Sequence, residues 1–267
     1  DILDGGADND TLIGGAGADT LDGGGGTADA ADYSLAATTG ITADLGILVA
    51  QLISEFEGLD TLIGIENLIG SIRNDSFTDA AGVNRLDGIA GNDTFFLKPD
   101  AATDTVVGGD GTLDTINFFF ATSAVSASFG ATAFAGTATG GGQGTTTFTG
   151  IERIIGGNFG DAILGGASGE ILFGRGGNDA INGGGGGDQI LGEAGNDTIN
   201  DGAGTDSADG GAGNDTFFAA ADGATDTVTG GADTDTLDLF FATGAAIVTF
   251  GATAFAGTAS GGGQGTT

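Results

Sequence analysis

An apolar residue recurs every nine positions along much of the chain, set between polar and glycine-rich stretches. From Gly156 to Phe218 the sequence divides into seven consecutive nonapeptides of the form Gly-Gly-x-Gly-x-Asp-x-U-x, where U is apolar. The glycines permit the positive φ values of a tight turn, and the x-U-x tail predicts a short strand with U directed inward. The eighth positions are Ile163, Leu172, Ile181, Ile190, Ile199, Ala208 and Phe217.

Two nonapeptides, each with one turn and one strand, are expected to form one coil. The pattern therefore predicts an all-β fold, a parallel β-roll or β-solenoid interrupted by longer β-coil inserts. Glu66 precedes Asp93 by 27 residues, whereas Glu152 precedes Asp215 by 63 residues. The difference of 36 residues equals two whole coils, so the longer stretch keeps every strand on the same face.

Glycine-rich blocks alternate with segments of another type. Val125, Ala127 and Phe129 alternate with Ser126 and Ser128, which predicts a strand in one of these inserts. The inserts either continue the solenoid as longer coils or pack on it as a hairpin or loop. The predicted segments are repeat blocks at 1–26, 67–111 (degenerate) and 151–233, and β inserts at 27–66, 112–150 and 234–267, the last a truncated copy of 112–150.

The sixth position of the nonapeptides is acidic. In the main block these residues are Asp161, Glu170, Asp179, Asp188, Asp197, Asp206 and Asp215. They could form a solvated acidic face, but carboxylates stacked at a coil spacing of about 4.8 Å would repel one another without a cation. An oxygen-only set of ligands suits Ca²⁺, so the pattern favours several calcium ions between coils.

Composition narrows the range of functions. The formal charge of −32 would repel nucleic acid and anionic membrane surfaces. The sequence has no Cys and no His, which excludes nucleophilic cysteines, histidine-dependent triads and His or Cys zinc sites. A glycosidase with two carboxylates is the one enzyme class left open, but no acidic pair stands out among so many. The expected role is structural and not enzymatic. No apolar run is long enough to span a membrane.

These nonapeptides resemble the repeats of the RTX (repeats-in-toxin) proteins. The resemblance is specific at Gly156 to Phe218 and Gly5 to Asp22, and weaker at Gly70 to Phe96. The spacer ADYSLAATTGITADLG makes the chain most similar to large RTX adhesins and surface-layer proteins. The resemblance implies a calcium-loaded β-roll, export by type I secretion and an extracellular or bacterial cell-surface location.

The resemblance also implies a set of calcium ligands, paired one coil apart as Asp161 with Asp179, Asp179 with Asp197, Asp197 with Asp215 and Asp188 with Asp206. Glu170 departs from the pattern, and its extra methylene is expected to push the carboxylate outward. Asn84 replaces the acid in DAAGVNRLD. The implied ligands are the carboxylates of Asp10, Asp19, Asp75, Asp93, Asp161, Asp179, Asp188, Asp197, Asp206 and Asp215 and, from turns, Gly174, Gly176, Gly183, Gly185, Gly192, Ala194, Gly210 and Ala212.

Two functional classes fit these expectations. The first is an extracellular structural protein, such as a surface layer, filament or adhesin stalk, that folds on calcium binding after secretion. The second is the C-terminal export and folding module of a larger RTX toxin, protease or lipase. Expected partners are other copies in a filament or lattice, or cell-surface polysaccharide. Phe119 and Phe240 are expected on the outer side, either as an extra core row beneath a loop or as a contact surface.

Overall fold

The fold is all-β. A computed structural model describes residues 1–36, 38–219, 222–238 and 247–250. In this part of the chain the strands are mostly parallel and stack as a β-solenoid, as the nonapeptide pattern predicts. The described residues include no helix that is long and apolar enough to cross a membrane.

Contacts within the chain divide it into two compact units. The first comprises Asp1–Ala121 and Gly142–Glu152, and the second comprises Thr122–Gly141 and Arg153–Thr267. The division falls within the predicted insert 112–150, whose strands belong partly to one unit and partly to the other.

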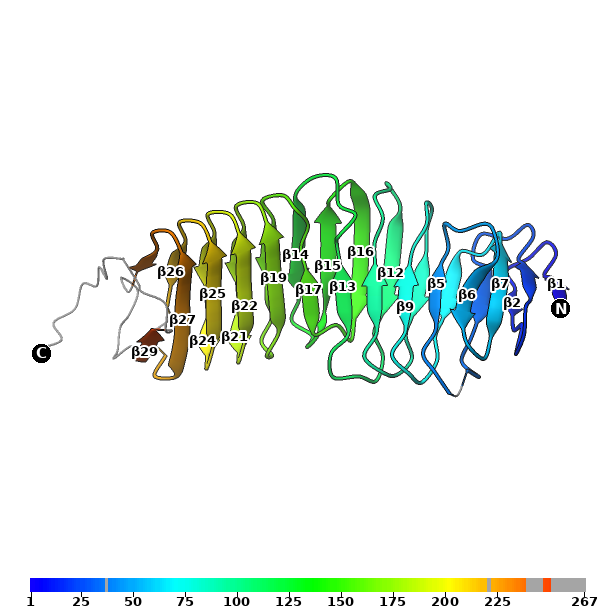
Figure 1. Cartoon of the computed structure of the whole chain (residues 1–267), viewed down its shortest axis with the longest axis horizontal. Coiled ribbons are helices and arrows are strands. Elements are labelled where there is room, and N and C mark those ends of the chain that lie inside the picture. The colour runs from blue at the N-terminus through cyan, green and yellow to red at the C-terminus, as the bar shows by residue number, and fades with distance from the viewer. Residues whose placement is uncertain (37, 220–221, 239–246, 251–267) are drawn as a thin grey trace, which may run out of the picture. The chain divides into compact units, whose positions relative to one another are not determined.

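In the second unit, strands repeat at the predicted two nonapeptides per coil. Ile163 is in register with Ile181, and Ile181 with Ile199, each 18 residues apart. Figure 1 shows β19, β22, β25 and β27 stacked side by side. One sheet contains β14 (Val125–Phe129), β18 (Ala162–Leu164), β20 (Ala180–Asn182), β23 (Thr198–Asn200), β26 (Thr216–Phe218) and β28 (Thr236–Asp238), with β15 (Ala135–Gly140) antiparallel to β14. The other contains β17 (Arg153–Ile155), β19 (Ile171–Gly176), β22 (Gln189–Ala194), β25 (Ser207–Ala212), β27 (Thr225–Ala232) and β29 (Ile247–Phe250), and β21 (Gly185–Gly186) pairs with β24 (Ala203–Gly204).

The first unit has the same construction with three sheets. The largest contains β2 (Thr11–Leu12), β4 (Ala30–Asp32), β8 (Asn67–Ile69), β10 (Arg85–Asp87), β12 (Thr103–Val107) and β16 (Gln143–Thr149). Facing strands are β5 (Thr42–Asp44), β9 (Ser76–Thr78), β11 (Thr94–Phe96) and β13 (Thr115–Asn117). A third sheet contains β1 (Ile2–Asp4), β3 (Thr20–Asp22), β7 (Gly58–Ile63) and β6 (Gln51–Ser54).

The core of each unit consists of the apolar U residues. All seven eighth positions between Gly156 and Phe218 are buried, as predicted. In the first unit Phe77 and Phe95 occupy the same place in successive coils, with ring centroids 5.8 Å apart in an edge-on arrangement. Each U side chain therefore packs on its counterpart one coil away, which stabilises the stack by about 1.5–3 kcal/mol per buried side chain.

The inserts both continue the stack and add a hairpin. In 27–66, β5 pairs forward with β9 of the following coil, whereas β7 pairs back with β3 of the preceding one. In 112–150, β14 pairs forward with β18, and β16 pairs back with β12. Val125, Ala127 and Phe129 are buried, which confirms the strand predicted from their alternation. The antiparallel strands β15 and β6 lie in the same sheets as β14 and β7, so the described parts of the inserts continue the solenoid, and the hairpins are part of its sheets.

Phe119 lies on the outside, as predicted. Its side chain is 51% exposed, whereas its neighbour Phe118 is buried. The rings of Phe119 and Phe120 meet edge-on with centroids 5.2 Å apart. Phe240 lies outside the described residues, as does most of the predicted insert 234–267.

Candidate metal centre

The sixth-position acids form ladders from coil to coil. Between regular coils, the backbone N–H of such a residue donates to the carboxylate Oδ1 of the residue 18 positions later. The distances are 2.7 Å from Asp161 to Asp179, and 2.8 Å from Asp179 to Asp197 and from Asp197 to Asp215. On the opposite edge Asp188 donates to Asp206 at 2.7 Å. The structure thus brings together the acids that were expected to pair.

These carboxylates are buried. Nine of the ten predicted acidic ligands are no more than 4% exposed, and Asp10 is half-buried. This burial rules out the alternative of a solvated acidic face. The carboxylates are buried because of their place in the backbone. Each acid stands immediately before a strand whose U residue points inward, so its short side chain can be directed toward the turn.

One oxygen of most of these carboxylates has no hydrogen-bond donor. Within the described residues, the buried Oδ2 atoms of Asp179, Asp188 and Asp197 accept no hydrogen bond. Burial raises the pKa of Asp179 and Asp188 to about 7, and neighbouring carboxylates add to the effect. Oδ2 atoms in the same state belong to Asp10, Asp19, Asp93, Asp206 and Asp215. Oδ2 of Asp75 and Oδ2 of Asp161 instead accept the N–H of Ser71 and Gly157.

The first glycine of each nonapeptide makes room for that oxygen. A Cβ on Gly174 would overlap Asp179 Oδ2 and lie 2.9 Å from the carbonyl oxygen of Gly192 in the next coil. The same relationship holds at Gly192, where a Cβ would overlap Asp197 Oδ2 and lie 2.6 Å from the Gly210 carbonyl oxygen. In the regular coils, a carboxylate oxygen and a carbonyl oxygen of the next coil therefore lie close together beside the first-position glycine. We call this place the corner of the coil.

The third-position carbonyls are engaged differently. Ala194 and Ala212 accept hydrogen bonds at 2.9 and 2.8 Å from the N–H groups of Gly177 and Gly195, one coil earlier. Gly176 and Gly185 donate to the carbonyl oxygens of Gly157 and Gly166. Their role as calcium ligands remains a prediction, whereas the first-position carbonyls of Gly174, Gly183, Gly192 and Gly210 approach the preceding coil at the carboxylate corner.

The prediction that Glu170 points outward is wrong. Glu170 is buried, its N–H donates to Asp188 Oδ1 at 2.8 Å, and its Oε2 accepts the N–H of Gly166 at 3.0 Å. Asp161 makes the equivalent bond to Gly157. The extra methylene is accommodated inside the turn because the longer side chain still reaches the second-position N–H.

Six further buried acids continue the ladders through irregular coils, and the glycine-based pattern missed them. Asp206 donates to Asp226 at 3.1 Å and Asp215 to Asp235 at 3.0 Å, each 20 residues later. Each of the six stands two positions before a buried apolar residue, so the shorter pattern Asp-x-U would have found them. They are Asp29, Asp60, Asp104, Asp114, Asp226 and Asp235.

A second, exposed ladder runs beside the buried one. The fifth-position residue Asn196 donates its N–H to Asn178 Oδ1 at 2.9 Å, and Asn214 donates to Asn196 Oδ1 at 2.7 Å. These amides satisfy turn N–H groups that face water, which accounts for the frequent Asn-Asp pair without any binding role.

The buried oxygens fit a hard cation. Among the described residues no three acidic side chains gather at one point, so a bound ion would need backbone carbonyl oxygens beside one or two carboxylates. Such carbonyls are present at the corners occupied by the Oδ2 atoms of Asp179, Asp188 and Asp197. Ca²⁺ takes six to eight oxygen ligands, carbonyl oxygens included, in flexible geometry, whereas Mg²⁺ demands a near-ideal octahedron.

Comparison with known families identifies the same segments. The RTX calcium-binding nonapeptide repeat (4 copies) matches residues 1–27, 60–96, 146–181, 182–217 and 218–239, which together are more than half of the chain. Comparison with curated proteins finds no match.

Proposed function

Because the chain belongs to the family of RTX calcium-binding nonapeptide repeats, we propose that it is an extracellular structural protein whose coils fold when calcium binds between them. Calcium binding is the property that the family carries. The cell-surface setting, the structural role and secretion by a type I system are the proposal.

The observation that carries this proposal is the row of buried carboxylate oxygens without donors in the described coils. A buried ionised carboxylate costs several kcal/mol unless it is paired. Lys and Arg number five against 37 acids, so the chain itself offers too few cations to pair them. Ca²⁺ supplies positive charge at each corner and joins oxygens of successive coils.

The residues that would hold the ions follow from the geometry. Asp179, Asp197 and Asp215 would contribute carboxylates on one edge, and Asp188 and Asp206 on the other. First-position carbonyls of Gly174, Gly183, Gly192 and Gly210 would contribute the facing oxygens. Gly176, Gly185, Ala194 and Ala212 are proposed as additional carbonyl ligands from the third position.

A structural role is supported by the arrangement of blocks and inserts. Insert 112–150 recurs at 234–267, where residues 250–267 repeat 129–146 with one difference. Near-identical sequences 121 residues apart favour a repeated partner through multivalency. Such a partner is either another copy, in a filament or lattice, or a polysaccharide of the cell surface.

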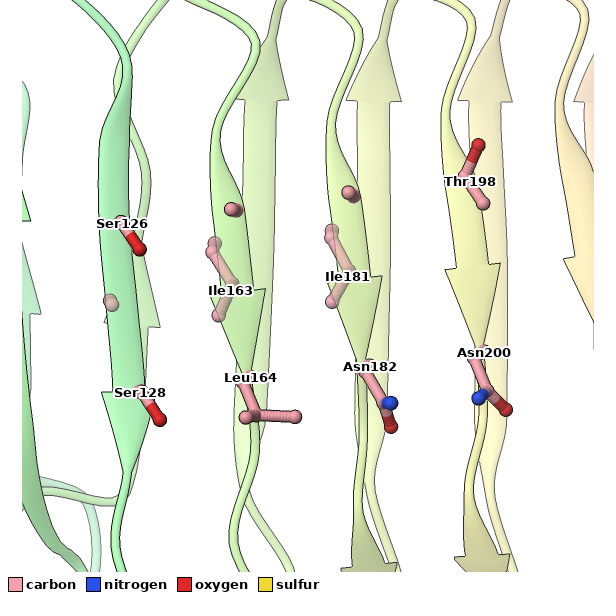
Figure 2. Close-up of a pocket in the computed structure, with 11 residues that line it drawn as sticks. Ser126, Ser128, Ile163, Leu164, Ile181, Asn182, Thr198 and Asn200 are labelled. Atoms are coloured by element: carbon pink, nitrogen blue, oxygen red, sulfur yellow. The ribbon is translucent and has the colours of Figure 1, made fainter.

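One outer face supports the polysaccharide alternative. A shallow groove of about 360 Å³ crosses β14, β18, β20 and β23. Figure 2 shows Ser128, Leu164, Asn182 and Asn200 in one line across these strands. Hydroxyl and amide groups repeated at coil spacing could hydrogen-bond to sugar hydroxyls without involving charge.

The calcium step is tested by circular dichroism during titration. The protein should change from a disordered to a β-rich spectrum at roughly 10⁻⁴ to 10⁻³ M calcium, the range of extracellular modules. An identical spectrum in excess chelator and in millimolar calcium would refute the proposed mechanism.

Electron microscopy of the calcium-loaded protein tests the array, since ordered fibres or sheets are expected. A folded monomer at high concentration would favour the alternative, an export and folding module of a larger toxin, protease or lipase.

A further inference from the structure

The turn at residues 79–84 departs from the nonapeptide pattern at two positions. Its first position is Asp79 where glycine is usual, and its sixth is Asn84 where an acid is usual. In the flanking nonapeptides, a Cβ on Gly70 or Gly88 would overlap the sixth-position carboxylate oxygen of Asp75 or Asp93. A side chain at the first position is therefore directed toward the place that the sixth-position carboxylate occupies in the flanking nonapeptides.

Asp79 places a carboxylate in a buried environment. It is 1% exposed, and its Oδ1 accepts the backbone N–H of Lys98 at 2.6 Å. Its Oδ2 is buried and accepts no hydrogen bond from the described residues. The ammonium group of Lys98 does not supply a partner, because it donates to Asp44 Oδ1 at 2.6 Å.

Asn84 does not take over the missing role. Its Oδ1 accepts the N–H of Ala80 at 3.0 Å, and its Nδ2 donates to the carbonyl oxygen of Glu66 at 2.8 Å. Both ends of the amide are thus used inside the protein. Asp79 is the acidic side chain that this turn contributes.

The following coil brings further carboxylates to the same turn. Asp104 is buried and accepts the N–H of Asn84 at 2.9 Å, and Asp100 accepts the N–H of Gly82 at 2.7 Å. Burial, together with the charges of Asp104 and Asp100, raises the pKa of Asp79 to about 8. An ionised Asp79 at this place needs positive charge beyond that of Lys98, whose ammonium group is already paired with Asp44.

We propose that Asp79 replaces the absent sixth-position acid and that, together with Asp104, it binds a Ca²⁺ ion between the turns at 79–84 and 97–104. The inference rests on the proposed calcium binding and extends it to a turn whose sixth position is neutral. As at the regular corners, backbone carbonyls would complete the set of ligands.

The number of calcium ions per chain tests the site. Native mass spectrometry of the whole protein should show one ion fewer in D79N than in the wild type. The control D87N removes the same charge from the same coil, at a half-buried residue that pairs with Arg85 at 2.6 Å, and should keep the wild-type number. An unchanged count in D79N, with an unchanged calcium midpoint, would overturn the site, because the ionised carboxylate of Asp79 would then contribute nothing to calcium binding.

A double variant provides the rescue. D79G/N84D moves the carboxylate from the first position to the regular sixth position and should restore the lost ion. If D79N does not fold, this variant decides: folding with the wild-type count supports the site, and folding with one ion more overturns it, because the new sixth-position carboxylate would then have added a site instead of replacing one. If the wild type binds no calcium, the proposed function fails. If only the D79N comparison fails, the proposed function stands.

Discussion

The backbone N–H of Asp179 donates to Oδ1 of Asp197 at 2.8 Å, while Oδ2 of Asp197 accepts no hydrogen bond from the described chain. The two oxygens of one carboxylate therefore have separate tasks. Oδ1 joins successive coils directly, and Oδ2 faces the corner where a carbonyl oxygen of the next coil converges. Substitutions that remove one property and keep the other can separate these tasks.

Asp197→Ala and Asp197→Asn make this separation. Alanine leaves the buried N–H of Asp179 without its acceptor, which should destabilise the calcium-loaded fold by about 1–3 kcal/mol. Asparagine can keep the acceptor but loses the charge, so it should raise the calcium midpoint without destabilising the calcium-free chain. Calcium titrations monitored by circular dichroism and urea unfolding measure both effects. Asp209→Asn, a half-buried residue of the same charge, serves as the control. Equal midpoints for Asp197→Asn and the control would contradict the assignment.

The calcium-free protein should lose stability as the pH rises. Burial and neighbouring acids raise the pKa of Asp93 to about 8, of Asp179 and Asp188 to about 7, and of Asp215 to about 6, from an ordinary value of 3.8. The folded state then binds more protons than the unfolded state, so this stability is complete below about pH 4 and disappears between about pH 6 and 8. Circular dichroism in calcium-free buffer should show β structure at about pH 4.5, near the lower end of this range. The β structure should be lost by about pH 8. Greater calcium-free stability at the higher pH would contradict this reasoning.

The first-position glycine Gly192 should tolerate no side chain. Gly192→Ala would place a Cβ against Asp197 Oδ2 and 2.6 Å from the Gly210 carbonyl oxygen. We expect a strong loss of both stability and calcium affinity, since neither neighbour is free to move. Gly187→Ala is the matched control, because its Cβ would meet only the Thr205 carbonyl oxygen, at 3.3 Å. Similar unfolding midpoints for the two variants would show that the corner is not closely packed.

The second position should prefer glycine for a different reason. Glu193 has a φ of 71°, in the left-handed region, where a non-glycine residue costs about 1–2 kcal/mol. Glu193→Gly should therefore raise the free energy of unfolding by about 1 kcal/mol. Glu193→Gln removes the charge but keeps the strain, so it separates the backbone effect from the electrostatic one. The reverse change, Gly211→Ala at a φ of 94°, should destabilise the protein.

The regular coils were predictable because two signals coincide in them. Glycines mark the turn and a U residue marks the strand, so Ile163, Ile181 and Ile199 could be placed in register from their spacing alone. In the irregular coils only the Asp-x-U part remains. Asp104 and Asp226 therefore escaped notice, although the structure gives them the same bond to the preceding coil.

Side-chain direction and strand partners were harder to predict. The outward orientation expected for Glu170 neglected the second-position N–H of Gly166, which its carboxylate reaches at 3.0 Å. The strand at Val125–Phe129 was visible in the sequence, but its forward pairing with β18 depends on residues 36 positions later. Local patterns identify a strand, whereas distant pairing depends on which edges the rest of the fold leaves open.

The buried ladder has a direction. In every regular pair the earlier coil provides the N–H donor and the later coil provides the carboxylate acceptor, as from Asp161 to Asp179 and from Asp188 to Asp206. A growing stack is thus chemically unlike at its two ends: its carboxyl-terminal end presents N–H donors without acceptors, and its amino-terminal end presents carboxylate Oδ1 atoms without donors. If coils are added starting from the amino terminus, the last folded coil has two buried N–H donors without acceptors until the next coil is added. If coils are added toward the amino terminus, each new coil brings its donors to acceptors that are already in place. The direction of these hydrogen bonds therefore favours assembly of the coils toward the amino terminus.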